Sequence, residues 1–267
     1  MIDIGPPPLV LARPAIIRPA PVEFIHPSFR QMHAGLEPDQ AIAFMPGFRK
    51  PVAAPVDLAF QAITTHTNEA QTVTFTAVGI GAAAADRYVF ILVPYYNGST
   101  IQPVISSATI GGVAATIHAS IVVASTTRGG CALISALVPT GATATIVLNF
   151  SASGAGFYRP RIGVYRVAGL QSTSTVDLLT YSNIGSNIPR TFTVNVAKDG
   201  LVIFGCFVYG NSIARTMSVM TPDFSVSPVG SVQYLGSGAT TAASGTQSCT
   251  ITGGTTAQWA VIMASFR

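Results

Sequence analysis

The sequence predicts an all-β protein: an antiparallel two-sheet sandwich, jelly-roll-like or immunoglobulin-like, preceded by an extended proline-rich N-terminal arm. Eleven of the eighteen prolines lie before residue 58. After that point the chain becomes a succession of short runs rich in Thr, Val and Ile, separated by Gly, Ser, Asn and Pro, and helical periodicity is nearly absent. We therefore expect an arm over residues 1–58 and a β-sandwich over residues 59–267.

The arm begins MIDIGPPPLVLARPAIIRPAPVEF, which is apolar and yet carries a proline every few residues. Each proline fixes φ, removes a backbone donor and pushes the preceding residue toward an extended conformation. Such a segment cannot form a helix or a central strand. Because its apolar runs are interrupted, it resembles neither a signal peptide nor a membrane span. We expect the arm to lie extended across other polypeptides.

The arm residues expected to form that interface are apolar side chains and two arginines, which would pair with carboxylates or carbonyls of the partner. They are Leu9, Val10, Leu11, Arg13, Ile16, Ile17, Arg18, Val22, Phe24 and Ile25. One short helix is expected around residues 38–44, where Pro46 and Gly47 would end it.

Two stretches alternate apolar and polar residues, which is typical of strands with one buried face. In QTVTFTAV, Val73 and Phe75 point one way and the threonines the other, and RTFTVNV at 190–196 repeats the design. Further runs of strand length, rich in β-branched or aromatic residues, are RYVFILV at 87–93, CALISALV at 131–138, TATIVLNF at 143–150, RIGVYRV at 161–167, LVIFGCFVY at 201–209 and QWAVIMASF at 258–266.

The links between these runs favour antiparallel pairing. VPTGAT and AKDG are short and contain Gly or Pro, which suits hairpins, whereas parallel strands would need crossover helices. About eight to eleven strands fit residues 59–267, enough for one two-sheet domain. We expect this domain to fold without a metal or a cofactor.

Charge and cysteine content narrow the classes of partner. Only 9% of the residues are charged and the formal net charge is +4. Arg159, Arg161 and Arg166 form the densest basic cluster, which is too short to indicate nucleic-acid binding. Three widely spaced cysteines exclude a dense disulfide framework: Cys206, among apolar neighbours, is expected to be a buried thiol, and an intersubunit bridge through Cys131 or Cys249 is an open alternative.

Five blocks carry a resemblance to a known class of proteins. They are GIGAAAADRYVFILV, ISSATIGGVAATI, LVPTGATATIVLNFS, RIGVYRVAGL and AQWAVIMASFR. In this order, over residues 70–267, they resemble a β-domain of virion structural proteins of tailed bacteriophages and prophages. The opening MIDIGPPPLVLARPAIIRP resembles the starts of phage proteins of this group. The resemblance implies a head decoration, neck or tail component whose N-terminal segment holds the β-domain to the particle.

No catalytic pattern accompanies these structural blocks. The four histidines are scattered, and none pairs with another ligand at zinc-site spacing. Asp86 and Arg87 suit a turn or a salt bridge at the start of a strand, and Asp177, Asp199 and Asp223 stand in turn-like contexts where carboxylates cap backbone amides. GxSxG elbows and phosphate loops are lacking. We expect no catalytic, cofactor-binding or metal-binding residues and no enzyme.

Two functions follow as hypotheses. The first is a structural virion protein, located in the virion, whose partners are other virion proteins and copies of itself, without nucleic acid or membrane. The alternative is a receptor- or glycan-binding module of a tail fibre or spike, whose partner would be a host surface glycan. Its ligand-facing rings would come from the aromatic residues Tyr95, Tyr96, Phe157, Tyr158 and Tyr234.

Overall fold

The computed structural model describes residues 54–66, 70–97, 103–123, 128–151, 159–210, 214–254 and 256–267. These residues form strands and no helix, so the predicted all-β class is confirmed. They belong to one unit, Ala53–Arg267, and the predicted domain boundary at residue 58 falls inside its first strand. The predicted arm up to residue 53, and with it the helix expected at 38–44, lies outside the described residues.

The described strands divide into two successive sets. The first set is β1 (Asp57–Thr65), β2 (Thr72–Gly79), β3 (Tyr88–Asn97), β4 (Ile105–Ile110), β5 (Val113–Ala114), β6 (Thr116–Val122), β7 (Arg128–Leu137), β8 (Thr143–Phe150) and β9 (Arg161–Ala168). The second is β10 (Asp177–Asn187), β11 (Arg190–Val196), β12 (Leu201–Gly210), β13 (Thr216–Ser218), β14 (Phe224–Val229), β15 (Val232–Thr240), β16 (Gly245–Thr252) and β17 (Thr256–Phe266).

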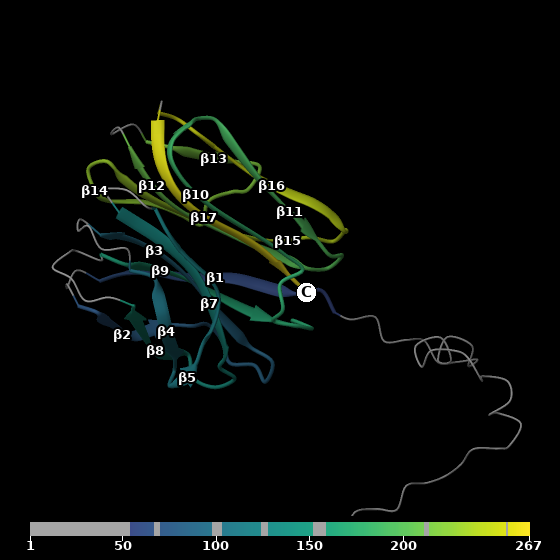
Figure 1. The fold of residues 1–267 in the computed structure, drawn as a ribbon. Coiled ribbons are helices and arrows are strands. Elements are labelled where there is room, and N and C mark those ends of the chain that lie inside the picture. The colour runs from purple at the N-terminus through teal and green to yellow at the C-terminus, as the bar shows by residue number, and fades with distance from the viewer. Residues whose placement is uncertain are drawn as a thin grey trace, which may run out of the picture. The chain divides into compact units, whose positions relative to one another are not determined.

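The strands form four antiparallel sheets stacked in the order B, A, C, D, as Figure 1 shows from bottom to top. Sheet A has the order β1-β9-β3-β7-β6, and sheet B, which covers it, has the order β2-β8-β4-β5. Sheet C has the order β10-β17-β12-β15-β14, and sheet D has the order β11-β16-β13. Sheets A and B are built from the first set of strands, and sheets C and D from the second.

The two sets have the same topology. In the first set β1 pairs with β9 and β2 with β8, while β3 pairs with β7, so that the strands nest as in one long folded hairpin. In the second set β10 pairs with β17, β11 with β16 and β12 with β15, which is the same nesting. Each set is therefore a jelly-roll-like sandwich, and the chain contains this architecture twice.

This duplication corrects the predicted single sandwich. The described residues form seventeen strands in four sheets, rather than about eight to eleven strands in two. The two predicted hairpin links are also wrong. VPTGAT joins β7 of sheet A to β8 of sheet B, and AKDG joins β11 of sheet D to β12 of sheet C. Both links cross between the layers of a sandwich, because neighbouring strands of the nested hairpin are rolled into opposite sheets.

The position of each sheet explains its sequence pattern. Sheets A and C are covered on both faces, and their central strands β3, β12 and β17 are the uninterrupted apolar runs. Sheets B and D have one outer face, and their strands β2 and β11 alternate buried apolar residues with exposed threonines. An apolar side chain is needed only where a face is covered, so burial on two faces removes the alternation.

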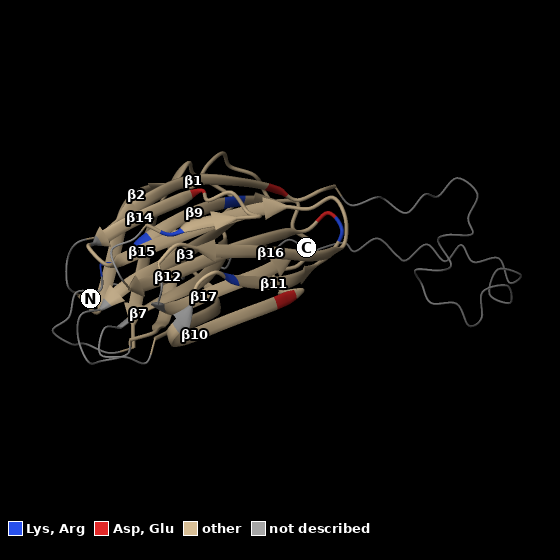
Figure 2. Ribbon diagram, turned by 90° about the horizontal axis from the view of Figure 1, so that it is seen from above, with Lys and Arg blue, Asp and Glu red and all other residues tan. Residues whose placement is uncertain are grey.

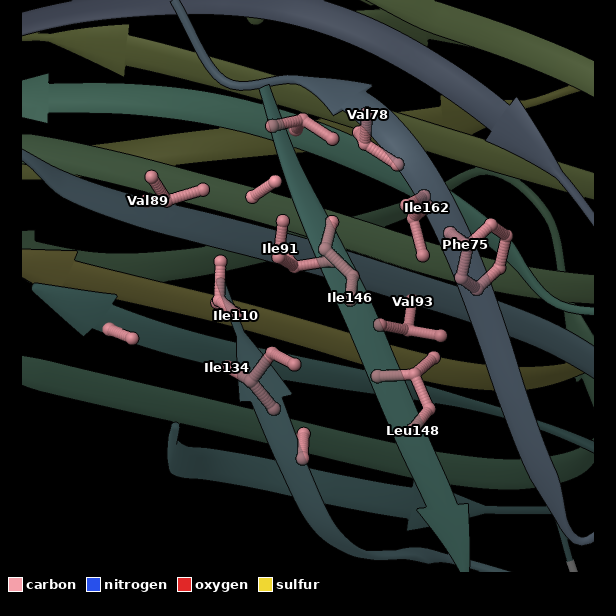
Figure 3. Packing of buried hydrophobic residues seen from close by; sticks show 14 of the residues in the cluster. Phe75, Val78, Val89, Ile91, Val93, Ile110, Ile134, Ile146, Leu148 and Ile162 are labelled. Carbon is pink, nitrogen blue, oxygen red and sulfur yellow. The ribbon is translucent and has the colours of Figure 1, made fainter. Parts of the chain in front are cut away.

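Three hydrophobic layers hold the stack together. The layer between sheets A and B contains Phe75 and Leu148 from one sheet and Ile91 and Ile134 from the other (Figure 3). An equivalent layer between sheets C and D surrounds Trp259. The third layer, which we call the seam, lies between sheets A and C and joins the two sandwiches.

Large side chains of one sheet occupy the seam opposite glycines of the other. A Cβ atom placed on Gly205 of sheet C would overlap Leu92 of sheet A, and a Cβ on Gly129 of sheet A would overlap the ring of Phe207 of sheet C. Phe90 and Phe266 meet edge to face across the same layer, with ring centroids 4.9 Å apart. The close approach of the two sheets therefore depends on backbone positions that have no side chain.

The strands define two ends of the molecule. At one end, the base, β1 begins beside the end of β9, and β12 begins beside the C-terminal end of β17. The amide of Val56 donates a hydrogen bond to the carbonyl of Asp199 and joins the two sandwiches there. At the opposite end, the tip, Tyr96 pairs with Gly129, and Tyr209 pairs with Gln258.

We expect Gly205→Ala to destabilise the unit by about 1–3 kcal/mol, because the added methyl group must displace Leu92 in a packed layer. The matched control is Gly79→Ala, since nothing lies within 4 Å of a Cβ at that position. The free energy of unfolding in urea measures both changes. Equal midpoints for the two variants would contradict the glycine-dependent packing of the seam.

Candidate functional site

Partly exposed tyrosine and arginine side chains lie at the tip of the seam. Tyr96 at the end of β3 and Tyr209 at the end of β12 occupy equivalent positions in the two sandwiches, and both point into the seam and are half-buried. The ring of Tyr96 stacks on Phe207, with a centroid distance of 6.5 Å and an interplanar angle of 16°. Internal symmetry therefore brings two tyrosines to one place.

Two arginines stand beside these rings at the start of β9. The buried Tyr234 donates a hydrogen bond of 3.1 Å from its hydroxyl group to the carbonyl of Arg159. Arg159 has a φ of 28°, an uncommon conformation for a residue other than glycine. The hydrogen bond therefore fixes the backbone that leads into Arg161.

Arg161 alternates along β9 with Ile162, which faces sheet B, so its side chain points into the seam. It is half-buried, and its Nε atom is buried without a hydrogen-bond partner. A guanidinium group offers five donors and no acceptor, so only an acceptor can satisfy that atom. We refer to Tyr96, Tyr209, Arg159 and Arg161 as the tip cluster.

Electrostatic interactions link these groups. Burial raises the pKa of Tyr96, the neighbouring Tyr209 raises it further, and Arg159 acts in the opposite direction. Burial also raises the pKa of Tyr234 well above its ordinary value, while Arg161 and Arg159 lower it. Tyr96 and Tyr234 are therefore neutral hydrogen-bonding groups at physiological pH, next to two arginines.

Charge is distributed unequally between the two ends (Figure 2). Of the acidic residues that the structure describes, Asp57, Asp86, Asp177 and Asp199 lie at the base. Asp57 forms an ion pair with Arg166 there. Within the described ranges, no carboxylate belongs to the tip cluster.

The structure corrects two of the predicted ligand-facing aromatic residues. Tyr95 and Tyr234 are completely buried, and the hydroxyl group of Tyr95 donates a hydrogen bond of 2.6 Å to the carbonyl of Pro103. Tyr95 alternates with Tyr96 along β3 and therefore points into the layer between sheets A and B. Tyr96 alone of these three is partly exposed.

The remaining predicted site residues lie outside the described residues. These are Phe157, Tyr158 and the ten arm residues Leu9, Val10, Leu11, Arg13, Ile16, Ile17, Arg18, Val22, Phe24 and Ile25. Tyr209 was missed as a site residue because it ends an apolar run that resembles a core strand. The sequence feature that could have identified Tyr209 is its position: when the sequences of β3 and β12 are aligned, Tyr209 corresponds to Tyr96.

The carboxylates singled out in the sequence bind backbone amides. Asp86 accepts a hydrogen bond from the amide of Gly169, Asp223 accepts one from the amide of Gly238, and Asp177 accepts one from the amide of Asn195. This is the capping role predicted for Asp177 and Asp223. Asp199 has a φ of 54°, as expected of a tight turn.

Arg87 is completely buried without a carboxylate partner. Its guanidinium group donates to the carbonyls of Val138, Gly81, Thr140 and Gly141 over distances of 2.6–2.8 Å. Four charge-assisted hydrogen bonds compensate for its lost hydration and tie the β7–β8 link to the start of β3. The role of this arginine is therefore structural. Of the predicted turn or salt bridge, the turn is observed, because the amide of Arg87 donates to the carbonyl of Ala84, while the guanidinium group binds carbonyls rather than Asp86.

The cysteines are buried and unpaired. Burial raises the pKa of Cys131, Cys206 and Cys249, the last to about 12. The prediction for Cys206 is confirmed, whereas the alternative of an intersubunit bridge through Cys131 or Cys249 is wrong, because neither sulfur reaches the surface.

Two further features bear on cofactors and membranes. In the part of the chain that the structure describes, no group of three or more His, Cys, Asp or Glu side chains is arranged to hold a metal ion. The same residues contain no helix of sufficient length and apolarity to span a membrane.

Comparisons with known proteins do not assign this chain to a family. No family model, no curated protein and no solved structure matches this chain.

His118 on β6 provides a test of burial in the seam. Its ring stacks on Phe90 and meets Phe266 at 4.9 Å, and its Nε2 atom lies 2.8 Å from the hydroxyl oxygen of Ser135. Burial lowers its pKa from 6.5 to about 4. Between these two values the unfolded chain binds a proton that the folded chain does not.

The free energy of unfolding should therefore fall as pH decreases from 6.5 to about 4 and should not depend on this histidine above pH 6.5. We expect His118→Gln to reduce the loss between pH 7 and pH 4.5 by about 1–2 kcal/mol, after allowing for the partial exposure of the ring. Urea unfolding at a series of pH values measures the difference. Parallel pH profiles for the two proteins would show that His118 is not buried as described.

Proposed function

We propose that this chain is a non-enzymatic structural component of a tailed-bacteriophage particle, docked by its N-terminal arm and displaying the double sandwich on the head, neck or tail surface. Its proposed location is the virion, and its proposed partners are other virion proteins and copies of itself. The resemblance of the sequence blocks to phage virion proteins supports the class. The observation that carries the proposal is the asymmetry between base and tip.

Several contacts fix the chain where the described residues begin. Val56 is buried at the base, where its amide hydrogen-bonds to Asp199, and a Cβ placed on Gly169 would lie 3.3 Å from the carbonyl oxygen of Pro55. The β1 strand then starts with the ion pair between Asp57 and Arg166. A load applied through the arm would therefore reach the sandwich at a reinforced point, which suits an anchored component.

The outer face of sheet D suits a durable surface of low charge. Thr191 and Thr250 share a hydrogen bond of 2.8 Å between their hydroxyl groups, Thr193 bonds Ser248 at 3.0 Å, and Thr216 bonds Thr252 at 2.7 Å. On sheet B, Asn149 links Thr72 to Ser107 in the same manner. Paired hydroxyl groups of this kind remain hydrated without adding charge, which is consistent with the low charge fraction of the whole chain.

A receptor- or glycan-binding module of a tail fibre or spike is the second candidate function. The tip cluster favours it, because partly exposed tyrosines and arginines meet at the end opposite the base. The two functions are compatible, since one uses the arm and the other the tip.

We expect a chain that begins at Ala54 to fold and to bind particles lacking this protein at least about 100-fold more weakly than the full chain, because an arm interface on the order of 1,000 Å² is lost. Circular dichroism in the presence of a chelator should show a β spectrum for the truncated chain. Co-sedimentation with the particles measures binding.

A matched control keeps the arm and removes two of its cations, Arg13→Gln with Arg18→Gln, and should give an intermediate loss. If the truncated chain is folded and binds as tightly as the full chain, the anchoring role of the arm is wrong.

A further inference from the structure

Arg161, at the tip of the seam, is a cation with an unsatisfied hydrogen-bond donor. The Nε atom of Arg161 is buried and has no acceptor, although the neighbouring Tyr234 has one in the carbonyl of Arg159. A buried donor without a partner lowers stability, and the penalty is greater for a charged group. By contrast, the buried Arg87 at the base donates to four carbonyls. The fold thus satisfies the guanidinium group of Arg87, whereas the half-buried Arg161 and the buried Arg215, which follows β12, keep donors without a partner.

The surroundings of Arg161 indicate what would satisfy that donor. Arg159 precedes Arg161 by two residues, and its carbonyl accepts the hydrogen bond of Tyr234, whose pKa both arginines lower. Arginine recognises planar oxyanions such as carboxylate and phosphate through paired N–H donors. Two arginines in one cluster, with the described carboxylates of the opposite end far along the strands, therefore favour an anionic group.

The tyrosines add a second recognition element. Tyr96 and Tyr209 are partly exposed, and each presents a rigid ring with a hydroxyl group at its edge. The ring of Tyr96 is held by stacking on Phe207, so it is ordered before any ligand binds. An apolar ring face with a hydroxyl group beside it suits a saccharide, which has hydroxyl groups at its edges and C–H groups on its faces.

Nucleic acid fits these observations less well. Binding a polynucleotide backbone requires a track of cations that follows successive phosphates. The cluster offers two arginines at one point, and Arg190, a third described cation near this end, is engaged over the ring of Tyr181 at 4.0 Å. A single anionic group attached to a sugar ring matches the cluster better.

We propose that Arg161, Arg159, Tyr96 and Tyr209 form a binding site for an acidic saccharide, in which the guanidinium groups hold an oxyanion of the ligand and the tyrosine rings contact its sugar ring. Carboxylate and phosphate groups share this chemistry. The site goes beyond the structural role proposed above and does not depend on the arm.

The experiment measures binding of three probes to the full chain by titration calorimetry. The probes are an oligogalacturonate, mannose 6-phosphate and a neutral galactose oligomer of the same length as the first. We expect the acidic probes to bind at least about tenfold more tightly than the neutral one, because charge-assisted hydrogen bonds contribute about 1.5–3 kcal/mol each. Preference between the two acidic probes identifies carboxylate or phosphate as the group recognised.

Two variants test the residues. Arg161→Gln should weaken binding of the preferred acidic probe by about tenfold or more and leave the neutral probe unchanged. Tyr209→Ala should weaken binding of both classes of probe, because the ring contacts the sugar rather than the anion. Arg190→Gln is the matched control, since it removes the same charge near the same end outside the cluster and should change binding by less than about twofold.

Four results would overturn the proposal. The first is equal affinity for acidic and neutral probes, and the second is no binding at millimolar concentrations. The third is an equal loss in Arg161→Gln and Arg190→Gln, which would reduce the effect to overall charge. Tighter binding of a single-stranded oligonucleotide than of every saccharide would equally contradict it and would indicate a nucleic-acid partner. None of these results affects binding through the arm.

Discussion

The seam between sheets A and C is the interaction on which the rest of the structure depends. Each jelly-roll-like sandwich covers one face of its inner sheet with its own outer sheet and leaves the other face apolar. That face is buried only by the corresponding face of the other sandwich. The glycines opposite Leu92 and Phe207 let the two backbones approach, so small positions on one side match large side chains on the other.

The seam also determines where chemistry can occur. Because both sandwiches run from base to tip in the same direction, equivalent strands end at the same end of the molecule, and Tyr96 and Tyr209 both lie at the tip of the seam. Carboxylate caps and the Asp57–Arg166 ion pair lie at the base, where Asp57, Asp86 and Asp177 stand at or just before the starts of strands. A base with capping carboxylates and a chemically distinct tip are thus two consequences of one duplicated fold.

The sequence was sufficient to predict the alternating and the strongly apolar strands, but neither the remaining strands nor the way the sheets stack. Alternation identified β2 and β11, and the apolar runs identified β3, β8, β12 and β17, with ends close to those observed. The second sandwich was missed because the same patterns fit one larger sandwich, and because β-pairing is set by contacts between residues distant in sequence. The similarity of RTFTVNV to QTVTFTAV was the visible trace of the duplication.

The sequence identified only part of the tip cluster. Arg161 belonged to the predicted basic cluster and Tyr96 to the predicted ligand-facing aromatic residues. Tyr95 and Tyr234 are buried instead. Alternation could not show this, because it separates the two faces of a strand but does not tell which of them another sheet covers.

The central claim, that the seam joins both sandwiches into one unit, is tested most directly by calorimetric unfolding of residues 54–267. If the seam couples the sandwiches, the account predicts a single transition whose calorimetric and van't Hoff enthalpies agree. Gly205→Ala should lower the midpoint of that transition as a whole. Two separate transitions, with only one of them moved by the substitution, would contradict the account.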